Sequence, residues 1–278
     1  AVTVVNAIAC GLGAALSVDL WTEATVNITS KQGKIEGKII NDPYEDTTLI
    51  QKTVRRVLEH FKLEDKFGAY VETRSNIPIA RGLKSSSAAA NAITLATLSA
   101  LDIRTDDLTA IRLGVEAAVD AGVTVTGAFD DASASYLGNL IVTDNVSMRI
   151  LKMFEVEEKN VLIYVPKEKS YTSKSDVSRM RLIEREVKAI HRLALNGDYW
   201  TAMTLNGMLY SSILGFNPRV AIEALESGAI AAGLSGKGPA VAAVVSDENL
   251  SRVEDRWRSF GGEMIRTRIN RKKAKILG

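Results

Sequence analysis

Residues 78–92 read PIARGLKSSSAAANA and combine a glycine, a lysine, three serines and a run of alanines. Gly and Ser are typical of flexible linkers, but residues 87–101 are rich in Ala and Leu, lack Gly and Pro, and predict a buried helix. The three serines would then form the N-cap and first turn, just after Gly82. Such a helix start offers free N–H groups and a positive dipole end, which suit a phosphate. The alternative is a well-capped core helix without a ligand.

The composition is that of an ordinary globular enzyme. The chain has 278 residues, 46% hydrophobic and 24% charged, enough for one large or two modest domains with a sizeable core. Lys and Arg number 35 against 33 Asp and Glu, which argues against a basic surface for nucleic acid or a membrane. The sequence shows no apolar stretch of membrane-spanning length and no apparent export signal. With a single Cys10 and two isolated histidines, His60 and His191, it predicts neither a disulfide nor a His-rich metal site, and we expect a cytoplasmic protein.

Strand and helix patterns alternate without a long linker, which favours an α+β fold. We expect the two histidines to be surface or capping residues of their helices. A polar, Lys- and Ser-rich connection near residues 166–176 predicts a boundary between a domain of residues 1–166 and one of residues 167–278. The patterns predict strands at 1–9, 14–28, 68–78, 136–143, 147–154, 160–166, 240–246 and 263–269, and helices at 46–63, 87–101, 106–122, about 176–224 and 247–260.

Two familiar phosphate motifs fail on inspection. The stretch GLGAAL at 11–16 begins like a dinucleotide fingerprint but has Leu16 where the third Gly or Ala should stand. The Gly-Lys-Gly at 236–238 lacks both the first glycine and the Ser or Thr of a P-loop. Neither a Rossmann cofactor site nor a Walker A loop is predicted.

Three Gly- and Ser-rich stretches remain: VVNAIACGLGAALSVDL at 4–20, PIARGLKSSSAAANA at 78–92, and GLSGKGPAVAAVV at 233–245. Their order, spacing and chemistry resemble the three motifs of the GHMP kinase superfamily, and the resemblance covers essentially the whole chain. Lys84 departs from the usual second glycine of the middle motif, and the first stretch lacks the lysine and glutamate of several members. These departures, with TGAFDDASASYLGN at 126–139, are similar to the archaeal type of shikimate kinase within the superfamily.

The resemblance implies an α+β, two-domain GHMP kinase fold. The N-terminal domain would be of the ribosomal protein S5 domain 2-like type and the C-terminal domain ferredoxin-like, with ATP and substrate between them. The implied reaction transfers the γ-phosphoryl group of ATP, with Mg²⁺, to the 3-hydroxyl of shikimate in aromatic amino-acid biosynthesis. Homoserine or mevalonate as acceptor, or a non-catalytic metabolite-binding regulator on the same fold, are the alternatives. The oligomeric state is not indicated.

The middle motif would hold the ATP phosphates. Lys84 adds a point charge to the backbone amides of the helix start. By resemblance Ser86 helps to hold Mg²⁺, and Glu116 on the following helix is our candidate for the carboxylate ligand, against an equally weighted interpretation as an exposed helix glutamate. The predicted phosphate-binding residues are Pro78, Ala80, Arg81, Gly82, Leu83, Lys84, Ser85, Ser86, Ser87 and Ala88.

The adjacent pair Asp130 and Asp131 would supply the base. Asp130 matches the superfamily's catalytic aspartate and would accept the proton of the acceptor hydroxyl, whereas alignment on Gly138 shifts that role to Asp131. The alternative is an Asp pair that caps a helix, which would not exclude catalysis. Lys174 and Arg179 could clamp the shikimate carboxylate, although a solvated basic helix start is the more frequent explanation. The full predicted substrate set is Asn6, Lys174, Arg179, Ser235, Gly236 and Gly238.

Overall fold

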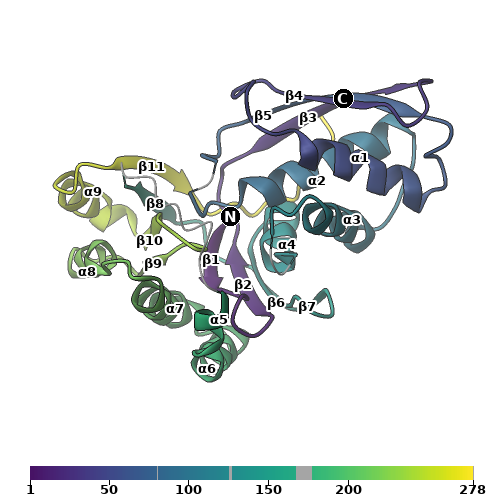
Figure 1. Ribbon diagram of the computed structural model, residues 1–278. Coiled ribbons are helices and arrows are strands. Elements are labelled where there is room, and N and C mark those ends of the chain that lie inside the picture. Colours follow the sequence, from purple (N-terminus) through teal and green to yellow (C-terminus); the bar gives the residue numbers. More distant parts are fainter. Residues whose placement is uncertain (80, 125–126, 167–176, 278) are drawn as a thin grey trace.

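The computed structural model describes residues 1–79, 81–124, 127–166 and 177–277, and within them three sheets organise the chain (Figure 1). The first sheet is antiparallel, with the order β1-β2-β6-β7. The second has β5 in its centre, antiparallel to β3 and parallel to β4. Their strands are β1 (Val2–Val5), β2 (Leu12–Leu16), β3 (Thr22–Thr29), β4 (Ile35–Ile39), β5 (Gly68–Ser75), β6 (Leu140–Asp144) and β7 (Arg149–Phe154).

The third sheet is antiparallel and has the order β11-β8-β10-β9. Numbered along the chain, its fourth, first, third and second strands are neighbours, and helices follow the first and third strands, which is a ferredoxin-like arrangement. The expected α+β class is confirmed. The strands are β8 (Asn160–Val165), β9 (Ala231–Leu234), β10 (Val241–Val245) and β11 (Glu263–Arg268).

Two groups of helices cover these sheets. Helices α1 (Thr48–His60), α2 (Ser85–Ala100) and α3 (Asp107–Asp120) gather on the side of β3–β5, and α4 (Phe129–Leu137) packs between α2, α3 and the strands β2 and β6 (Figure 1). The second group lies around the third sheet and the β1–β2 hairpin. It comprises α5 (Val177–Arg181), α6 (Glu184–Leu195), α7 (Tyr199–Leu214), α8 (Arg219–Glu226), the 3₁₀ turn η2 (Asp247–Asn249) and α9 (Leu250–Arg258).

Helix α2 is central because its side chains are small. A Cβ built on Gly114 of α3 would lie 3.4 Å from atoms of Ala90, so the two helices approach closely at these residues. Ile93 is fully buried under β3–β5, whereas Leu98 faces the cluster formed with α3 and α4. The predicted buried helix is therefore confirmed, and its first turn faces the third sheet.

Strand β8 lies in the same sheet as the later part of the chain. Its partners are β10 and β11, which belong to the predicted second domain. Residues 160–165 thus pair with the second domain, although the predicted division at residue 166 assigns them to the first. The pairing favours a boundary before Asn160, and the division into two domains stays a prediction.

The strand predicted at residues 136–143 begins later than expected. Helix α4 continues to Leu137, ends at Gly138 with φ +78°, and β6 begins only at Leu140. The predicted strand is therefore confirmed from Leu140 onward, whereas Tyr136 and Leu137 belong to the end of α4. Two short strands, β4 and β9, were not predicted.

His191 also differs from its prediction. It is 2% exposed, and its Nε2–H donates to the backbone oxygen of Thr143 at 3.2 Å. Burial lowers the pKa of this imidazole. His60 is exposed at the end of α1, as expected.

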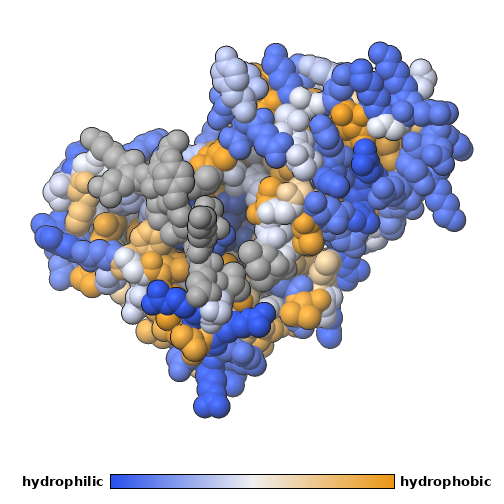
Figure 2. Space-filling model, viewed as in Figure 1, coloured by the Kyte–Doolittle hydropathy of each residue, from blue (hydrophilic) through white to orange (hydrophobic). Residues whose placement is uncertain are grey.

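No helix in the described part of the chain is long and apolar enough to cross a membrane. The molecular surface is hollowed between the lobe of β3–β5 with α1–α3 and the lobe of the third sheet (Figure 2). The first turn of α2 and the N-terminus of α4 lie where these two lobes meet (Figure 1).

Candidate active site

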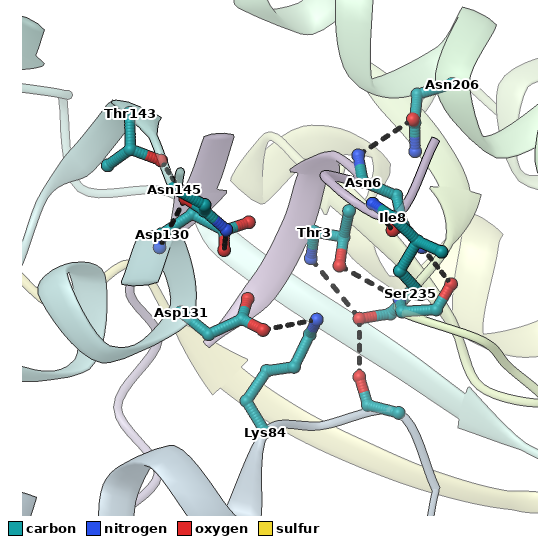
Figure 3. A network of polar contacts seen from close by, with 12 residues as sticks. Thr3, Asn6, Ile8, Lys84, Asp130, Asp131, Thr143, Asn145, Asn206 and Ser235 are labelled. Atoms are coloured by element: carbon teal, nitrogen blue, oxygen red, sulfur yellow. Dashed lines mark hydrogen bonds and ion pairs between the residues drawn. The ribbon is translucent and has the colours of Figure 1, made fainter. Parts of the chain in front are cut away.

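The three Gly- and Ser-rich stretches meet in space, and Ser235 joins them (Figure 3). Its hydroxyl donates to the backbone oxygen of Gly82 at 2.8 Å and accepts from the backbone N–H of Thr3 at 3.3 Å. The backbone N–H of Gly236 in turn donates to the Thr3 hydroxyl at 2.9 Å. Ser235 is 1% exposed, so these bonds lie in the interior. The sequence separation of these partners exceeds 150 residues, and only the tertiary fold brings them together.

Glycine is required where two of these loops touch. Gly82 has φ +79°, and a Cβ on it would lie 2.3 Å from the backbone oxygen of Ser235. Gly236 has φ +59°, and a Cβ there would approach Lys84 Nζ to 3.4 Å. Any larger residue at Gly82 would push the two loops apart, because the contact is with backbone.

The side chain of Asn6 links the first and third stretches by hydrogen bonds. Its Nδ2 donates to the Gly236 oxygen at 2.9 Å, and its Oδ1 accepts from the backbone N–H of Ile8 at 3.0 Å. Its own backbone N–H donates to Asn206 Oδ1 at 3.0 Å, while the hydroxyl of Tyr210 donates to its backbone oxygen at 3.0 Å. Both side-chain groups of Asn6 are therefore engaged within the protein.

Helix α2 begins at Ser85 after an unusual N-cap. Lys84 holds this position with φ +67°, in the left-handed region, and no side chain caps the helix. Ser85 and Ser86 are half-buried, whereas Ser87 is buried. A helix start with uncapped amides and the positive end of the helix dipole suits an anion, as in the phosphate cradle that the sequence predicts, and phosphate binding at this turn stays a prediction.

Lys84 points across to helix α4. Its Nζ lies 2.7 Å from Asp131 Oδ2, and the side chains are 14% and 6% exposed. The other carboxylate oxygen of Asp131, Oδ1, is buried and has no hydrogen-bond partner among the described residues. An ionised carboxylate with a free oxygen beside a cation can accept a proton from a hydroxyl group.

Asp130 faces a different neighbour. Its Oδ1 accepts from Asn145 Nδ2 at 2.7 Å, and a Cβ on Gly13 would lie 2.6 Å from its Oδ2. Burial, followed by the negative charge of Asp131, raises the pKa of Asp130 to about 7, against the opposing charge of Lys84 and the Asn145 hydrogen bond. The two adjacent aspartates thus have distinct surroundings, as consecutive helix residues must.

The other residues of the predicted phosphate set frame the loop. Leu83 and Ala88 pack with the large core cluster, and the backbone oxygen of Arg81 accepts from the N–H of Ala240 at 3.4 Å. Pro78 is half-buried just before the loop. Ala80 lies outside the described residues.

The described residues include only one member of the predicted carboxylate clamp. Arg179 is exposed on the short helix α5, and Lys174 lies outside the described residues. Gly238 has φ +74°, and a Cβ on it would lie 2.8 Å from the ring of Phe216. Backbone conformation and packing therefore explain why a glycine stands at this position.

Glu116 extends from a different side of α3 than Gly114 does. It lies two residues from Gly114, which contacts α2, and two residues turn a helix by about 200°. Its nearest cation is Arg56, whose Nε is 3.8 Å away and which pairs more closely with Asp120. The described residues contain no group of three His, Cys, Asp or Glu side chains that could hold a metal ion. The geometry therefore gives no support to Glu116 as a metal ligand.

Three residues of the site were missed by sequence reasoning: Thr3, Thr143 and Asn145. Thr3 carried a weak signal, because it is polar within the apolar strand that opens the chain. Asn145 follows Asp144 in a polar turn, where Asn is ordinary, and nothing in the sequence distinguishes it.

Comparisons with known proteins agree with this geometry. The GHMP kinases N terminal domain matches residues 48–139, and GHMP kinases C terminal matches residues 186–263. The shikimate kinase of Methanococcoides burtonii is 47% identical over 96% of this chain and 93% of its own length; that of Methanothrix thermoacetophila is 46% identical over 99% and 93%. The mevalonate kinase structure from Methanococcus jannaschii, 18% identical, covers 96% of this chain and 95% of its own with a TM-score of 0.77, a likeness of fold. The chain therefore belongs to the GHMP kinase family.

Proposed function

We propose that the protein is an ATP-dependent kinase that converts shikimate to shikimate 3-phosphate. The observation that carries the chemistry is the buried pair of Lys84 Nζ and Asp131 Oδ2, 2.7 Å apart, beside the uncapped start of α2. The choice of shikimate is supported by relatives of that name that are 40–47% identical over nearly the whole chain. A place in aromatic amino-acid biosynthesis and in the cytoplasm belongs to the same proposal.

ATP would bind with its phosphates at the first turn of α2. The amides of Ser85 and Ser86 are free of side-chain caps, and Gly82 lets the preceding loop lie against Ser235. Positively polarised N–H groups attract phosphate oxygens without needing a charged side chain. The same cradle accounts for the small residues Ala88 and Ala89 on the following turn.

Mg²⁺ fits this site best as part of the nucleotide complex. Magnesium retains several waters and is held by one or two protein oxygens together with substrate phosphates, so a preformed cluster of carboxylates is not required. The Ser86 hydroxyl, half-buried on the first turn of α2, is the proposed protein ligand. When bound, the ion neutralises charge that develops on the phosphate oxygens.

Asp131 would act as the base. Its Oδ1, which has no partner among the described residues, takes the proton of the acceptor hydroxyl. At the same time the oxygen of that hydroxyl forms a bond to the γ-phosphorus. The bond between the γ-phosphorus and the bridging oxygen breaks, and ADP leaves with that oxygen. The ion pair with Lys84 Nζ holds the Asp131 carboxylate in one orientation, and the Lys84 ammonium would lie on the same side as the transferred group. Asp130, the other candidate, is directed toward Asn145.

The carboxylate of shikimate would need a cation to bind it. Lys174 and Arg179 remain our proposed clamp, since they lie in the basic stretch between β8 and α6. Asn6, Ser235, Gly236 and Gly238 would shape the floor of the substrate site, where their bonds hold the loops together.

The experiment is a screen of ADP release from Mg²⁺ and ATP in the presence of shikimate, homoserine or mevalonate. We expect release that depends on shikimate, with a single product whose phosphorus couples to the proton at carbon 3 in the NMR spectrum. Comparable turnover of homoserine or mevalonate would refute the choice of acceptor. Binding of ATP and shikimate by calorimetry without ADP release would instead support a non-catalytic regulator.

A further inference from the structure

Asn145 holds the first turn of α4 from outside the helix (Figure 3). Its Oδ1 accepts from the backbone N–H of Asp130 at 3.1 Å and from the Thr143 hydroxyl at 2.6 Å, while its Nδ2 donates to Asp130 Oδ1 at 2.7 Å. Its own backbone N–H donates to the Gly11 oxygen at 2.8 Å. Asn145 and Asp130 are each 3% exposed. The amide of Asn145 therefore has one orientation, fixed from both ends.

The N-cap residue of α4 gives the helix start no side-chain hydrogen bond. The N-cap residue Ala128 has φ +49° and offers no side-chain hydrogen bond, so Asn145 supplies the acceptor that a capping side chain normally provides. On the opposite side, Asp130 Oδ2 is pressed against β2, where a Cβ on Gly13 would come within 2.6 Å. The carboxylate of Asp130 is thus held between Asn145 and a strand backbone.

Asp131 follows immediately in the same helical turn. Its direction toward Lys84 is therefore set by the placement of the backbone at Asp130, because neighbouring helix side chains diverge by a constant angle of about 100°. We propose that Asp130 and Asn145 are positioning residues that aim Asp131 Oδ1 at the acceptor hydroxyl; this rests on the proposed role of Asp131 as the base. Asp130 contributes through its hydrogen bonds and shape and does not itself take the substrate proton.

The charges around Asp130 predict a pH dependence of the rate, which would be absent if Asp130 only stabilised the fold. Asp131 is its neighbour on α4, Lys84 approaches from α2, and the charge of Asp130 also acts on the phenol of Tyr210 on α7. Burial and Asp131 raise the pKa of Asp130 to about 7, so its ionisation would place a second negative charge beside the base near neutral pH. The rate should therefore show an inflection near pH 7 that an uncharged residue at position 130 abolishes.

The test compares kcat, KM and pH profiles of four variants with the wild-type enzyme, using shikimate as acceptor. Asn145→Ala and Asp130→Ala should each lower kcat about 10- to 100-fold, the effect of a misplaced catalytic group, with KM for ATP within about threefold. The double variant should be no slower than the worse single one, because both act through the same turn. The Asp130→Asn side chain can still accept a hydrogen bond from Asn145, so its kcat should stay within about fivefold of wild type while the inflection near pH 7 is lost.

Ser133→Ala is the matched control: this buried hydroxyl of α4 has no hydrogen-bond partner among the described residues, and its removal should leave kcat unchanged.

Two results would overturn the proposal. If Asp130→Asn is as inactive as Asp131→Asn, the Asp130 carboxylate itself performs chemistry; if Asn145→Ala and Asp130→Ala both turn over normally, no positioning is needed. A crystal structure of Asn145→Ala gives an answer independent of activity, since we expect Asp131 to leave Lys84, and an unmoved ion pair would contradict us.

Should wild type reject shikimate but phosphorylate another acceptor, the proposed function fails and the variants are compared with that acceptor. Should Asn145→Ala not fold, Gly13→Ala displaces Asp130 from the other side and should give the same loss of kcat.

Discussion

At the scale of single residues, Lys84 adopts a backbone conformation that glycine takes without strain. Its φ of +67° costs a residue with a Cβ about 1–2 kcal/mol. The charge it carries is buried beside Asp131, and a buried ion pair by itself adds little stability. Strain and a buried charge at one position are typical of a functional site, where the geometry serves the chemistry.

Lys84→Ala and Lys84→Gly separate these two effects. Both remove the cation, so we expect kcat to fall in both by about 100-fold or more, the usual effect of losing one electrostatic group from an active site. The glycine variant should be about 1–2 kcal/mol more stable than the alanine variant, because only alanine keeps the left-handed strain. Urea unfolding and steady-state kinetics measure both. Equal stabilities would mean that the conformation at residue 84 costs nothing.

Asp131→Asn tests the base directly. The amide keeps the shape of the side chain but cannot take a proton, so kcat should fall about 100- to 10,000-fold while the affinity for ATP changes little. Single-turnover assays and nucleotide titrations distinguish the two quantities. A variant that turns over normally would leave catalysis to positioning and electrostatics alone.

Asp130 gives a prediction about stability and pH. Folding raises its pKa from 3.8 to about 7, so the folded state binds this proton more tightly than the unfolded chain does. The folded state is therefore favoured at low pH and loses that stability between about pH 4 and 7. Asp130→Asn cannot ionise, and relative to wild type it should gain stability from pH 4.5 to pH 7.5 in urea unfolding.

Asp106→Asn is the control of opposite sign. The Asp106 carboxylate caps α3, and its hydrogen bonds with Thr109 lower its pKa. Its stabilisation is present above the unfolded pKa and disappears at low pH, so this variant should lose stability relative to wild type as pH rises. If Asp130→Asn follows the same trend as Asp106→Asn, Asp130 is not a buried acid with a raised pKa.

At the scale of elements, α4 is held at both ends by distant parts of the chain. Beyond its C-terminus, a Cβ on Gly138 would lie 2.8 Å from the backbone carbon of Arg271. The N–H of Ala274 donates to the backbone oxygen of Tyr136 at 2.7 Å, and Lys273 pairs with Asp107 on α3. The segment after β11 thus crosses back over the helix that carries the aspartates.

Gly138→Ala should therefore cost more than an ordinary glycine substitution. It introduces left-handed strain and also a clash with backbone that cannot move aside cheaply. Gly122→Ala is the matched control, since Gly122 has φ +69° but no heavy atom lies within 4 Å of the place that its Cβ would take. We expect a loss of about 1 kcal/mol for Gly122→Ala and about 2–4 kcal/mol for Gly138→Ala in urea unfolding. Equal losses would show that the tail yields without cost.

At the scale of the whole molecule, Ser235 links the third sheet to the loop before α2 and to β1. Ser235→Ala leaves the Gly82 oxygen and the Thr3 N–H without their partner in a buried place, which should cost about 1–3 kcal/mol of stability. It should also raise KM for ATP, because the phosphate loop loses its anchor. Thr267→Val is the control, since the Thr267 hydroxyl on β11 is buried without a partner among the described residues and its loss should be neutral or stabilising. An unchanged KM for Ser235→Ala would contradict the anchoring role.

Much of the fold could be predicted because its signals are local. The amphipathic spacing in α1, the small apolar residues of α2 and the β-branched run of β1 each follow from neighbouring residues, and the structure confirms them. The strands β4 and β9 were not predicted because β4 has a glycine at its centre and β9 reads Ala-Ala-Gly-Leu, and Gly and Ala are uncommon in strands. The pairing of β8 with β10 and β11 was not predicted, because the sequence of one segment does not show which distant strand it pairs with or in which register.

The sequence by itself determined the family and the presence of an aspartate pair, and it predicts the phosphate loop, since these are contiguous motifs whose chemistry can be read in order. Only the tertiary structure decided that Asp131 meets Lys84 while Asp130 meets Asn145, and that Glu116 lies beside Arg56. Adjacent residues of a helix point about 100° apart, so the partner of each depends on what the fold places on that side. Composition and spacing along one chain carry no information about those directions.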